Sequence, residues 1–311
     1  MDALSDILRA IRLRSAVYFR SDFSSPWGMQ IDDGPFAQFH LIVRGNCWMR
    51  MRGFGKPRLL SGGDVVVFPH GDAHWLADDP AQKRAPGKAV VQAHLQNQPM
   101  FQQGEFSTTL VCGHFEFDRH FDHPFLQALP RFIHITDTER RERSWLETVT
   151  NVIIQEADSA QPGAEVVVER LAEVLFIQVL RAYMQQQKMT TGYLAALQDR
   201  QISQALKLVH ARPETNWTLE SISRTVGMSR SAFAARFKQL VGVTPMVYIT
   251  DWRMQKAREL LKNHAHPLVE VAEKVGYTSE AAFNRAFKRR FKQNPGAMRR
   301  ALLAKPRAMS K

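Results

Sequence analysis

An internal repeat in the last third of the 311-residue chain constrains its fold more than any other feature. The first copy begins at Leu219 and the second at Leu268, an offset of 49 residues that becomes 50 after a glycine in each copy. Apolar residues recur at i, i+3 and i+7 before that glycine, and two phenylalanines follow it at i and i+4. Each copy therefore predicts a helix, a tight turn and a second helix.

The turn of each copy carries residues that end one helix and begin the next. Gly227 and Gly276 stand where a residue in the left-handed conformation ends a helix at least cost. Ser229 and Ser279 follow, and a serine hydroxyl at this place caps the start of a helix. The pattern predicts a helix-turn-helix, a DNA-binding motif whose second helix enters the major groove.

Positive charge is concentrated in the same part of the chain. Residues 201–311 hold 21 Lys and Arg against 7 Asp and Glu, a net charge of +14, whereas residues 1–200 hold 21 against 23, a net charge of −2. A helical bundle with a solvated basic face would account for one copy of the repeat. Two copies together with this charge favour a module that binds nucleic acid.

The segment between the copies, residues 245–262, predicts one helix with Pro245 at its start. About 18 residues at a rise of 1.5 Å give a length of roughly 27 Å. A rigid spacer of this length can hold two recognition helices in successive major grooves, which are about 34 Å apart.

The C-terminal third resembles the AraC/XylS family of bacterial transcription regulators over roughly residues 200–300. The resemblance rests on the sequences MSRSAF, TP, WRM, GYTS and FNRAF, which occupy residues 228–233, 244–245, 252–254, 276–279 and 283–287. It implies a unit with two helix-turn-helix motifs that binds double-stranded promoter DNA and contacts RNA polymerase. The chain departs from the family at one turn, where Lys292 replaces a glycine, and a left-handed lysine there is expected to be mildly strained.

This resemblance and the polar faces of the two second helices give the candidate DNA-contacting residues. Ala234 and Ala235 offer only methyl groups, so the first copy is expected to read thymine methyls or to contact phosphates. The candidates are Arg230, Ser231, Ala234, Ala235 and Lys238 in the first copy, and Ser279, Glu280, Asn284, Arg285, Lys288 and Arg289 in the second.

The N-terminal part predicts a different fold. Residues 15–117 consist of short alternating apolar runs separated by turn residues, which is typical of a small β-barrel or sandwich, and Val90-Val91 is interpreted as one of the strands. The stretch from Gly63 to Asp78 resembles the second cupin motif and implies a cupin-type sensor domain. We therefore expect an all-β cupin-like barrel followed by connector helices, and an all-α domain with two helix-turn-helix motifs. The expected boundaries are 1–138 for the sensor, 139–195 for the connector, 196–302 for the DNA-binding domain and 303–311 for a basic tail.

The ligand set of a cupin metal enzyme is missing. The first cupin motif supplies a His-x-His pair and a glutamate, but the matching positions hold Asp32, Gly34 and Gln38, and only His74 remains of the usual set. We therefore expect a protein that is no enzyme, with no catalytic residue and no required cofactor. The alternative is a cupin-type metal-dependent enzyme fused to a DNA-binding domain.

Three kinds of signal remain open for the sensor. An improvised zinc site would draw on His40, His74, Cys112 and His114, although packed core residues are the favoured interpretation. Cys47 and Cys112 are candidates for a thiol redox switch, because His114 or Arg44 nearby can lower the pKa of a thiol. A small organic effector in the barrel mouth would contact aromatic side chains. The effector or sensor candidates are His40, Trp48, His74, Trp75, Cys112 and His114.

The connector is rich in apolar residues. The segment from Val166 to Met184 is apolar around most of its circumference, which indicates a helix buried on several sides. Packing against its own barrel is one explanation, and a homodimer interface is the favoured one. The sequence has no secretory signal and no run of about 18 apolar residues, so we expect a soluble, cytoplasmic protein without a membrane partner.

Overall fold

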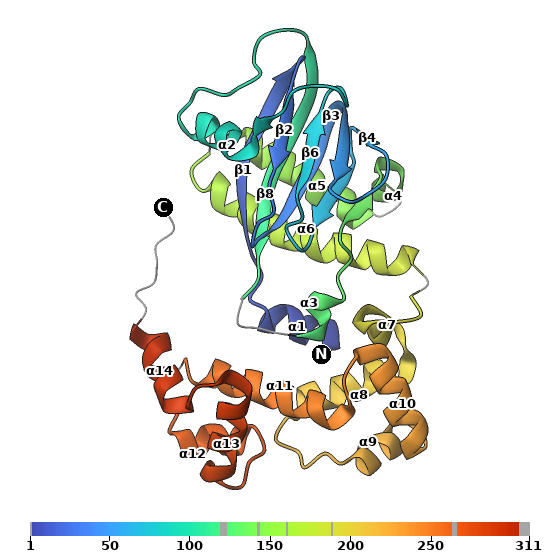
Figure 1. Ribbon diagram of the computed structural model, residues 1–311, viewed down its shortest axis with the longest axis vertical. Helices are drawn as coiled ribbons and strands as arrows, with labels where there is room; N and C mark the ends of the chain where they lie inside the picture. The colour runs from blue at the N-terminus through green and yellow to red at the C-terminus, as the bar shows by residue number, and fades with distance from the viewer. Residues whose placement is uncertain are drawn as a thin grey trace. The chain divides into compact units, whose positions relative to one another are not determined.

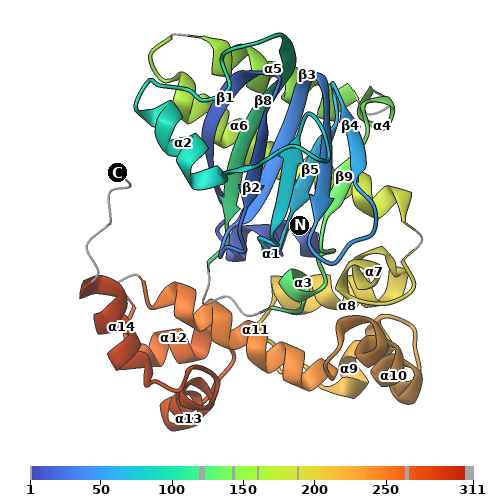
Figure 2. The ribbon, with the colours of Figure 1, turned by 45° about the horizontal axis from the view of Figure 1, so that its top comes forward.

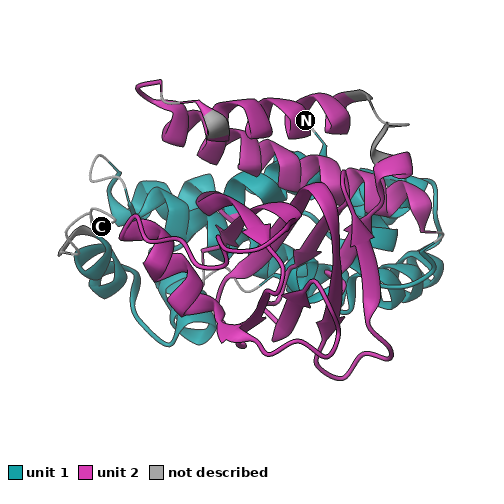
Figure 3. Cartoon of the chain, turned by 90° about the horizontal axis from the view of Figure 1, so that it is seen from above, with its two compact units in different colours: residues 1–10, 121–128, 189–311 teal, residues 11–120, 129–188 magenta. Residues whose placement is uncertain are grey.

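The computed structural model describes residues 2–118, 123–141, 144–159, 161–187, 189–262 and 266–304. The chain forms two compact units (Figure 3). Residues 11–120 and 129–188 form the sheet unit, and residues 1–10, 121–128 and 189–311 form the helical unit. This division differs from the predicted linear boundaries, because two short segments of the N-terminal half pack with the C-terminal helices. The predicted basic tail falls largely on residues 305–311, which lie outside the described residues.

The sheet unit is built on a curled, mainly antiparallel sheet in the order β1-β8-β3-β6-β2-β7 (Figures 1 and 2). The long strand β3 pairs with β8 and β5 in its first part and with β6 and β4 in its last part, so the sheet curls around it. This arrangement confirms the predicted cupin-like fold. The strands are β1 Arg14–Ser24, β2 Gly28–Ile31, β3 Ala37–Met51, β4 Arg58–Ser61, β5 Val65–Phe68, β6 His74–Ala77, β7 Ala85–Pro86, β8 Phe106–Glu116 and β9 Ile133–Ile135.

Four helices complete the sheet unit: α2 Gly87–Leu95, α4 Asp137–Arg141, α5 Ser144–Asp158 and α6 Ala164–Gln186. Helix α5 packs against α6, and α6 lies along β1 (Figure 2). Phe176 of α6 is fully buried, with its ring centre 5.0 Å from that of Phe115 in β8. The predicted burial of this helix therefore comes at least in part from its own sheet.

The prediction of a strand at Val90-Val91 is wrong, because both residues lie in α2. Only Val90 is buried, and it packs into the core of the sheet unit. A short apolar run fits a strand and a buried helical turn equally well, so periodicity could not separate the two.

The helical unit holds the repeat. Helices α9 and α10 form the first motif, α12 and α13 form the second, and α11 joins them (Figure 1). The predicted spacer helix is present over Pro245–Leu260. The helices are α1 Ala3–Ala10, α3 Pro124–Gln127, α7 Tyr193–Gln198, α8 Arg200–Ala211, α9 Leu219–Thr225, α10 Arg230–Val241, α11 Pro245–Leu260, α12 Leu268–Lys274, α13 Glu280–Phe291 and α14 Pro295–Ala304.

The local turns form as the sequence predicts. Gly227 and Gly276 have φ angles of 71° and 82°. The hydroxyls of Ser229 and Ser279 accept hydrogen bonds from backbone N–H groups and so cap α10 and α13. Lys292 ends α13 with a φ angle of 56°, so the turn keeps its left-handed geometry without glycine.

Arg253 of α11 fixes the second turn against the loop that precedes the first motif. Its guanidinium donates hydrogen bonds of 2.7 Å to the carbonyl oxygens of Pro213 and Thr215. Gly276 fits closely against the same loop, since a Cβ atom there would lie 2.7 Å from the carbonyl oxygen of Glu214. The two motifs are thus tied together by backbone contacts as well as by α11.

Gly276 and Gly227 occupy matching positions but differ in their surroundings, which makes them a matched pair for substitution. The Cβ atom that Gly227→Ala adds would meet no atom within 4 Å. This variant should therefore lower the free energy of unfolding only by the strain of a left-handed alanine, about 1 kcal/mol. Gly276→Ala adds a steric clash with backbone and should cost about 3 kcal/mol or more. Urea-induced unfolding of the two variants measures the difference, and equal losses would contradict the proposed close contact.

Candidate DNA-binding surface and sensor core

The predicted DNA-contacting residues lie on the sides of α10 and α13 that face away from the core. Ala234 and Asn284 are half-buried, and the other nine candidates are exposed. On the opposite sides, the phenylalanine pairs of both helices are buried. Each second helix therefore presents a polar or small-residue face while its phenylalanines anchor it.

Two arginines of these helices make structural ion pairs that the sequence did not reveal. Arg236 of α10 donates hydrogen bonds of 3.0 and 3.1 Å to the carboxylate of Asp199, the residue that caps α8. Burial alone would raise the pKa of Asp199, but hydrogen bonds from the backbone N–H of Ile202 and from Arg236 lower it. Arg290 of α13 lies 3.1 Å from Asp251 of α11. These two cations hold the recognition helices in place.

Three of the predicted sensor residues form a buried hydrogen-bonded chain in the sheet unit. Nδ1 of His74 lies 2.8 Å from the backbone carbonyl oxygen of Asp72, so this nitrogen donates and Nε2 of a neutral His74 accepts. Nε2 of His40 lies 2.8 Å from that Nε2 and must donate to it. Nδ1 of His40 therefore accepts, and the thiol of Cys112, 3.0 Å away, donates to it.

The electrostatics agree with this assignment. Burial lowers the pKa of His40 well below its usual value and that of His74 to about 4, so both rings are neutral. Burial also raises the pKa values of Cys112 and Cys47, and both thiols are free and buried. In this structure Cys112 is a protonated thiol beside a base rather than a thiolate.

The other sensor candidates do not take part in this hydrogen-bonded chain of side chains. His114 pairs with Glu116 at 3.2 Å and stacks on Tyr18, and Arg44 lies over the ring of Phe106. The expectation that His114 or Arg44 lowers a cysteine pKa is therefore wrong, because both have other partners and burial determines the shift. The described residues also contain no group of three or more His, Cys, Asp or Glu arranged for a metal ion.

Trp48 and Trp75 do not line the interior of the sheet, which corrects their prediction as effector contacts. Side chains alternate along a strand, and the buried neighbours Cys47 and Met49 place Trp48 on the outer face of β3. Trp75 also faces outward, with the guanidinium of Arg84 3.9 Å from its ring centre. The interior is filled by apolar residues, including Met29, Met49, Met51, Phe68 and Leu110.

The helical unit contains a second buried polar network, centred on the hydroxyl of Tyr248 in α11. It lies 2.6 Å from the hydroxyl of Tyr193, 2.7 Å from Nε2 of His210 and 3.0 Å from Nε2 of His123. Nδ1 of His123 accepts the backbone N–H of Phe125, so its Nε2 donates to Tyr248. A hydroxyl has one donor and two acceptor sites, so these three bonds saturate it.

This network joins segments that are far apart in the sequence. His123 caps α3, Tyr193 lies in α7 and His210 lies in α8. His210 also stacks on Trp252 with ring centres 3.7 Å apart, and its Nδ1 lies 3.8 Å from the carboxylate of Asp6 in α1. Burial lowers the pKa of His123 to about 3 and that of His210 well below its usual value, so both rings are neutral.

Comparison with known proteins identifies both parts of the chain. A family model described as cupin matches residues 2–185, and one described as a helix-turn-helix domain matches residues 222–301. The HTH-type transcriptional regulator AlkR of Acinetobacter baylyi is 31% identical over 308 residues, which cover 95% of this chain and 98% of AlkR. A putative AraC-like transcription regulator of Streptomyces antibioticus is 30% identical, with 96% and 99% covered. The chain belongs to the AraC family of transcription regulators.

Further relatives of this AraC family member cover its whole length or its C-terminal part. The RCS-specific HTH-type transcriptional activator RclR of Escherichia coli is 27% identical, with 96% of this chain and 97% of RclR covered. Among solved structures, the DNA-binding domain of AdpA in complex with a target DNA is 27% identical over 36% of this chain and 99% of that domain, with a TM-score of 0.33. In the described part of the chain, every helix is too short or too polar to span a lipid bilayer.

The Tyr248 hydroxyl offers a direct test of the buried network in this AraC family regulator. Tyr248→Phe leaves His123, His210 and Tyr193 without their shared partner, and each unsatisfied buried group costs about 1–3 kcal/mol. Tyr193→Phe removes one hydrogen bond and leaves Tyr248 two partners, so it should lower the free energy of unfolding by about 1 kcal/mol. Urea unfolding should show the larger loss for Tyr248→Phe, and losses below about 1 kcal/mol for both would contradict the network.

Proposed function

We propose that this regulator reads two successive major grooves of promoter DNA with α10 and α13. The observation that carries the proposal is the matched exposure of the two candidate faces on helices tied to one spacer, α11. Arg285 and Asn284 supply groups for bidentate contacts with base edges, whereas Lys238, Lys288 and Arg289 suit phosphates. Serine, alanine and glutamate at the remaining positions add short contacts to bases or to the backbone.

The proposal includes a homodimer joined through α5 and α6 of the sheet unit. Trp145 is 70% exposed at the start of α5, and Val166 and Val167 are 56% and 41% exposed at the start of α6. Large apolar side chains exposed on two packed helices favour a protein partner. A second copy of this chain would cover them, and RNA polymerase is the further partner that we propose for the DNA-bound protein.

We propose that the signal is a chemical change at Cys112 rather than a metal or a catalytic reaction. His40 already accepts the thiol hydrogen, so it can take the proton while the sulfur attacks a peroxide. An S–O bond then forms, the O–O bond breaks, and the transferred proton leaves with water, which gives a sulfenic acid. Because the interior is packed, an oxygen added to Cys112 would have to displace a neighbouring side chain, which is how the oxidation would change the sheet unit. Nothing in this scheme requires a cofactor, and the protein would act in the cytoplasm, where the DNA lies.

The network around Tyr248 is the proposed route from sensor to DNA. Helix α1 continues into β1 within four residues, and α3 lies in the chain between β8, which carries Cys112, and β9. Both helices belong to the helical unit, where His123 and Asp6 reach the Tyr248 and His210 side chains. A shift of β8 would therefore alter the helices that pack against α11.

Arg285→Ala tests base reading. Loss of a bidentate contact should weaken binding to the specific operator by about 1–3 kcal/mol and leave random DNA nearly unchanged. Arg224→Ala is the matched control, because this exposed arginine of α9 pairs with Glu220 and lies outside the recognition helices. Fluorescence anisotropy with both DNAs measures the effect, and an equal loss of Arg285→Ala on both would identify a phosphate contact instead.

Cys112→Ser tests the chemical signal. Hydrogen peroxide should add one oxygen atom to Cys112 and change operator affinity by about tenfold, within the usual range of coupling between sites. Cys112→Ser should bind DNA normally and lose the response, and Cys47→Ser should retain it. Intact-protein mass spectrometry and anisotropy measure the two effects, and a response that survives in Cys112→Ser would refute the proposal.

A further inference from the structure

A basic surface surrounds the turn between β3 and β4, at one edge of the sheet unit (Figures 1 and 2). Residues 34–63 hold five cations and no Asp or Glu, whereas residues 1–200 as a whole carry a net charge of −2. Positive charge is therefore concentrated on β3, β4 and the turn between them. The five cations, all exposed, are Arg44, Arg50, Arg52, Lys56 and Arg58.

Two aromatic side chains gather these cations on one surface. Phe54 of the turn packs edge-on against Phe132, with ring centres 5.4 Å apart. The guanidinium of Arg58 lies 4.9 Å from the ring centre of Phe132, and Nε of Arg50 donates a hydrogen bond of 3.4 Å to the carbonyl oxygen of Phe54. Arg131 lies 5.5 Å from the ring centre of Phe54 and pairs with a carboxylate of the β5–β6 loop. Residues 50–58 and 131–132 thus form one surface, which we call the hairpin surface.

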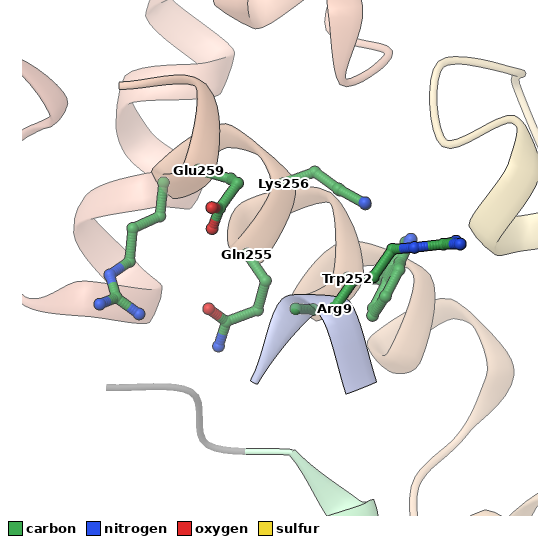
Figure 4. A pocket seen from close by; sticks show the side chains of 7 residues that line it. Arg9, Trp252, Gln255, Lys256 and Glu259 are labelled. Carbon is green, nitrogen blue, oxygen red and sulfur yellow. The ribbon is translucent and has the colours of Figure 1, made fainter. Parts of the chain in front are cut away.

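Carboxylates pair with several cations of this structure, but not with three that belong to the hairpin surface. Nη1 of Arg52 in the turn lies 3.1 Å from the carboxylate of Asp33. In the helical unit, Arg9 lines the pocket between α1 and α11 (Figure 4), and its Nη1 lies 3.7 Å from the carboxylate of Asp6. The cations of the hairpin surface without such a partner among the described residues are Arg50, Lys56 and Arg58. Their charges are available to an anion from outside the chain.

Duplex DNA is the anion whose charge complements this surface. Exposed arginine and lysine side chains bind DNA phosphates irrespective of sequence. DNA carries one negative charge per about 1.7 Å of helix axis, so several neighbouring cations can each meet a phosphate. The chain is a DNA-binding regulator, so its helical unit already brings DNA to the same molecule. Such tethering makes a second contact intramolecular and raises the effective concentration of phosphate at the hairpin surface.

We propose that the hairpin surface binds the phosphates of the DNA that flanks the operator. Arg50, Lys56 and Arg58 each contact one phosphate and read no base. The proposal rests on base reading by α10 and α13, which fixes the position of the protein along the DNA. The flanking contact adds sequence-independent affinity through the sheet unit, so the sensor itself contributes to DNA binding.

The salt dependence of operator binding tests the proposal on two duplexes that carry the same operator. A duplex of about 24 base pairs spans the two grooves, and one of about 60 base pairs adds the flanks. Each neutralised phosphate adds about 0.9 to the slope of log affinity against log salt. The parent protein should therefore show a slope steeper by about 2–3 on the longer duplex, and its preference for that duplex should fall about fortyfold between 50 and 200 mM salt. Fluorescence anisotropy with the full chain measures both quantities.

Substitution of the three cations by glutamine assigns the effect to the hairpin surface. The triple variant Arg50→Gln, Lys56→Gln and Arg58→Gln should show equal slopes on both duplexes and keep the parent's affinity for the short one. Lys56→Gln alone should reduce the difference in slope by about 0.9. Within the described chain the Lys56 ammonium makes no hydrogen bond or ion pair, so this single variant leaves the fold undisturbed. The matched control removes the same charge from β1, α2 and α6 and should keep the parent's difference, with the substitutions Arg14→Gln, Lys88→Gln and Arg181→Gln.

The possible results separate this proposal from base reading. Equal slopes of the parent on the two duplexes, or an equal loss in the control variant, would overturn the proposal. Uptake of a second duplex by the complex with the short operator would overturn the assignment to flanking DNA. Base reading stands in these cases if the short operator binds better than random DNA of the same length. Equal binding of those two short duplexes would contradict base reading by α10 and α13, and with it the proposal.

Discussion

Helix α11 is the constraint on which the rest of the helical unit depends. Its second half supplies Met254 and Ala257 to the core of the second motif, where they pack with Leu261, Phe283 and Phe287. Its first half meets the first motif through Tyr248, whose ring lies 5.6 Å from that of Phe237. Because both recognition helices rest on one rigid rod, their spacing is a property of the fold and not of a flexible linker.

Helix α11 also carries the side chains that bind the N-terminal segments α1 and α3 to the helical unit. A single hydroxyl, that of Tyr248, satisfies groups from three other helices, and Trp252 one turn later covers His210. Buried polar networks of this kind specify one arrangement, because every alternative leaves a polar group unpaired. The attachment of α1 and α3 is therefore selective, and a change in either helix has a defined set of partners to disturb.

The sequence predicted what depends on local spacing and failed where distant residues meet. Turn glycines, capping serines and phenylalanine pairs act within a few residues, so both motifs and the spacer helix were predictable. The pairing of Arg236 with Asp199 and the meeting of His123 with Tyr248 join residues 37 and 125 positions apart. No periodicity encodes such contacts, and for the same reason Arg236 had no distinguishing signal among its basic neighbours.

In the sensor, too, local patterns were predictable and contacts between distant residues were not. The alternating strands predicted the curled sheet, and the choice of His40, His74 and Cys112 as candidates included all three side chains of the buried chain. Which residues face inward depended on strand register, so Trp48 and Trp75 were placed on the wrong side. The pairing of β3 with β8 brings His40 opposite Cys112, a contact that only the long-range register produces.

Hydroxyl-radical footprinting of the full chain on its selected operator tests the central claim most directly. Two recognition helices on one rigid rod should protect two regions of DNA about one helical turn, or 10 base pairs, apart. The spacing should be the same on every operator variant that binds. Protection of one region alone, or of two regions whose separation varies between operators, would contradict a two-groove reader held at fixed spacing by α11.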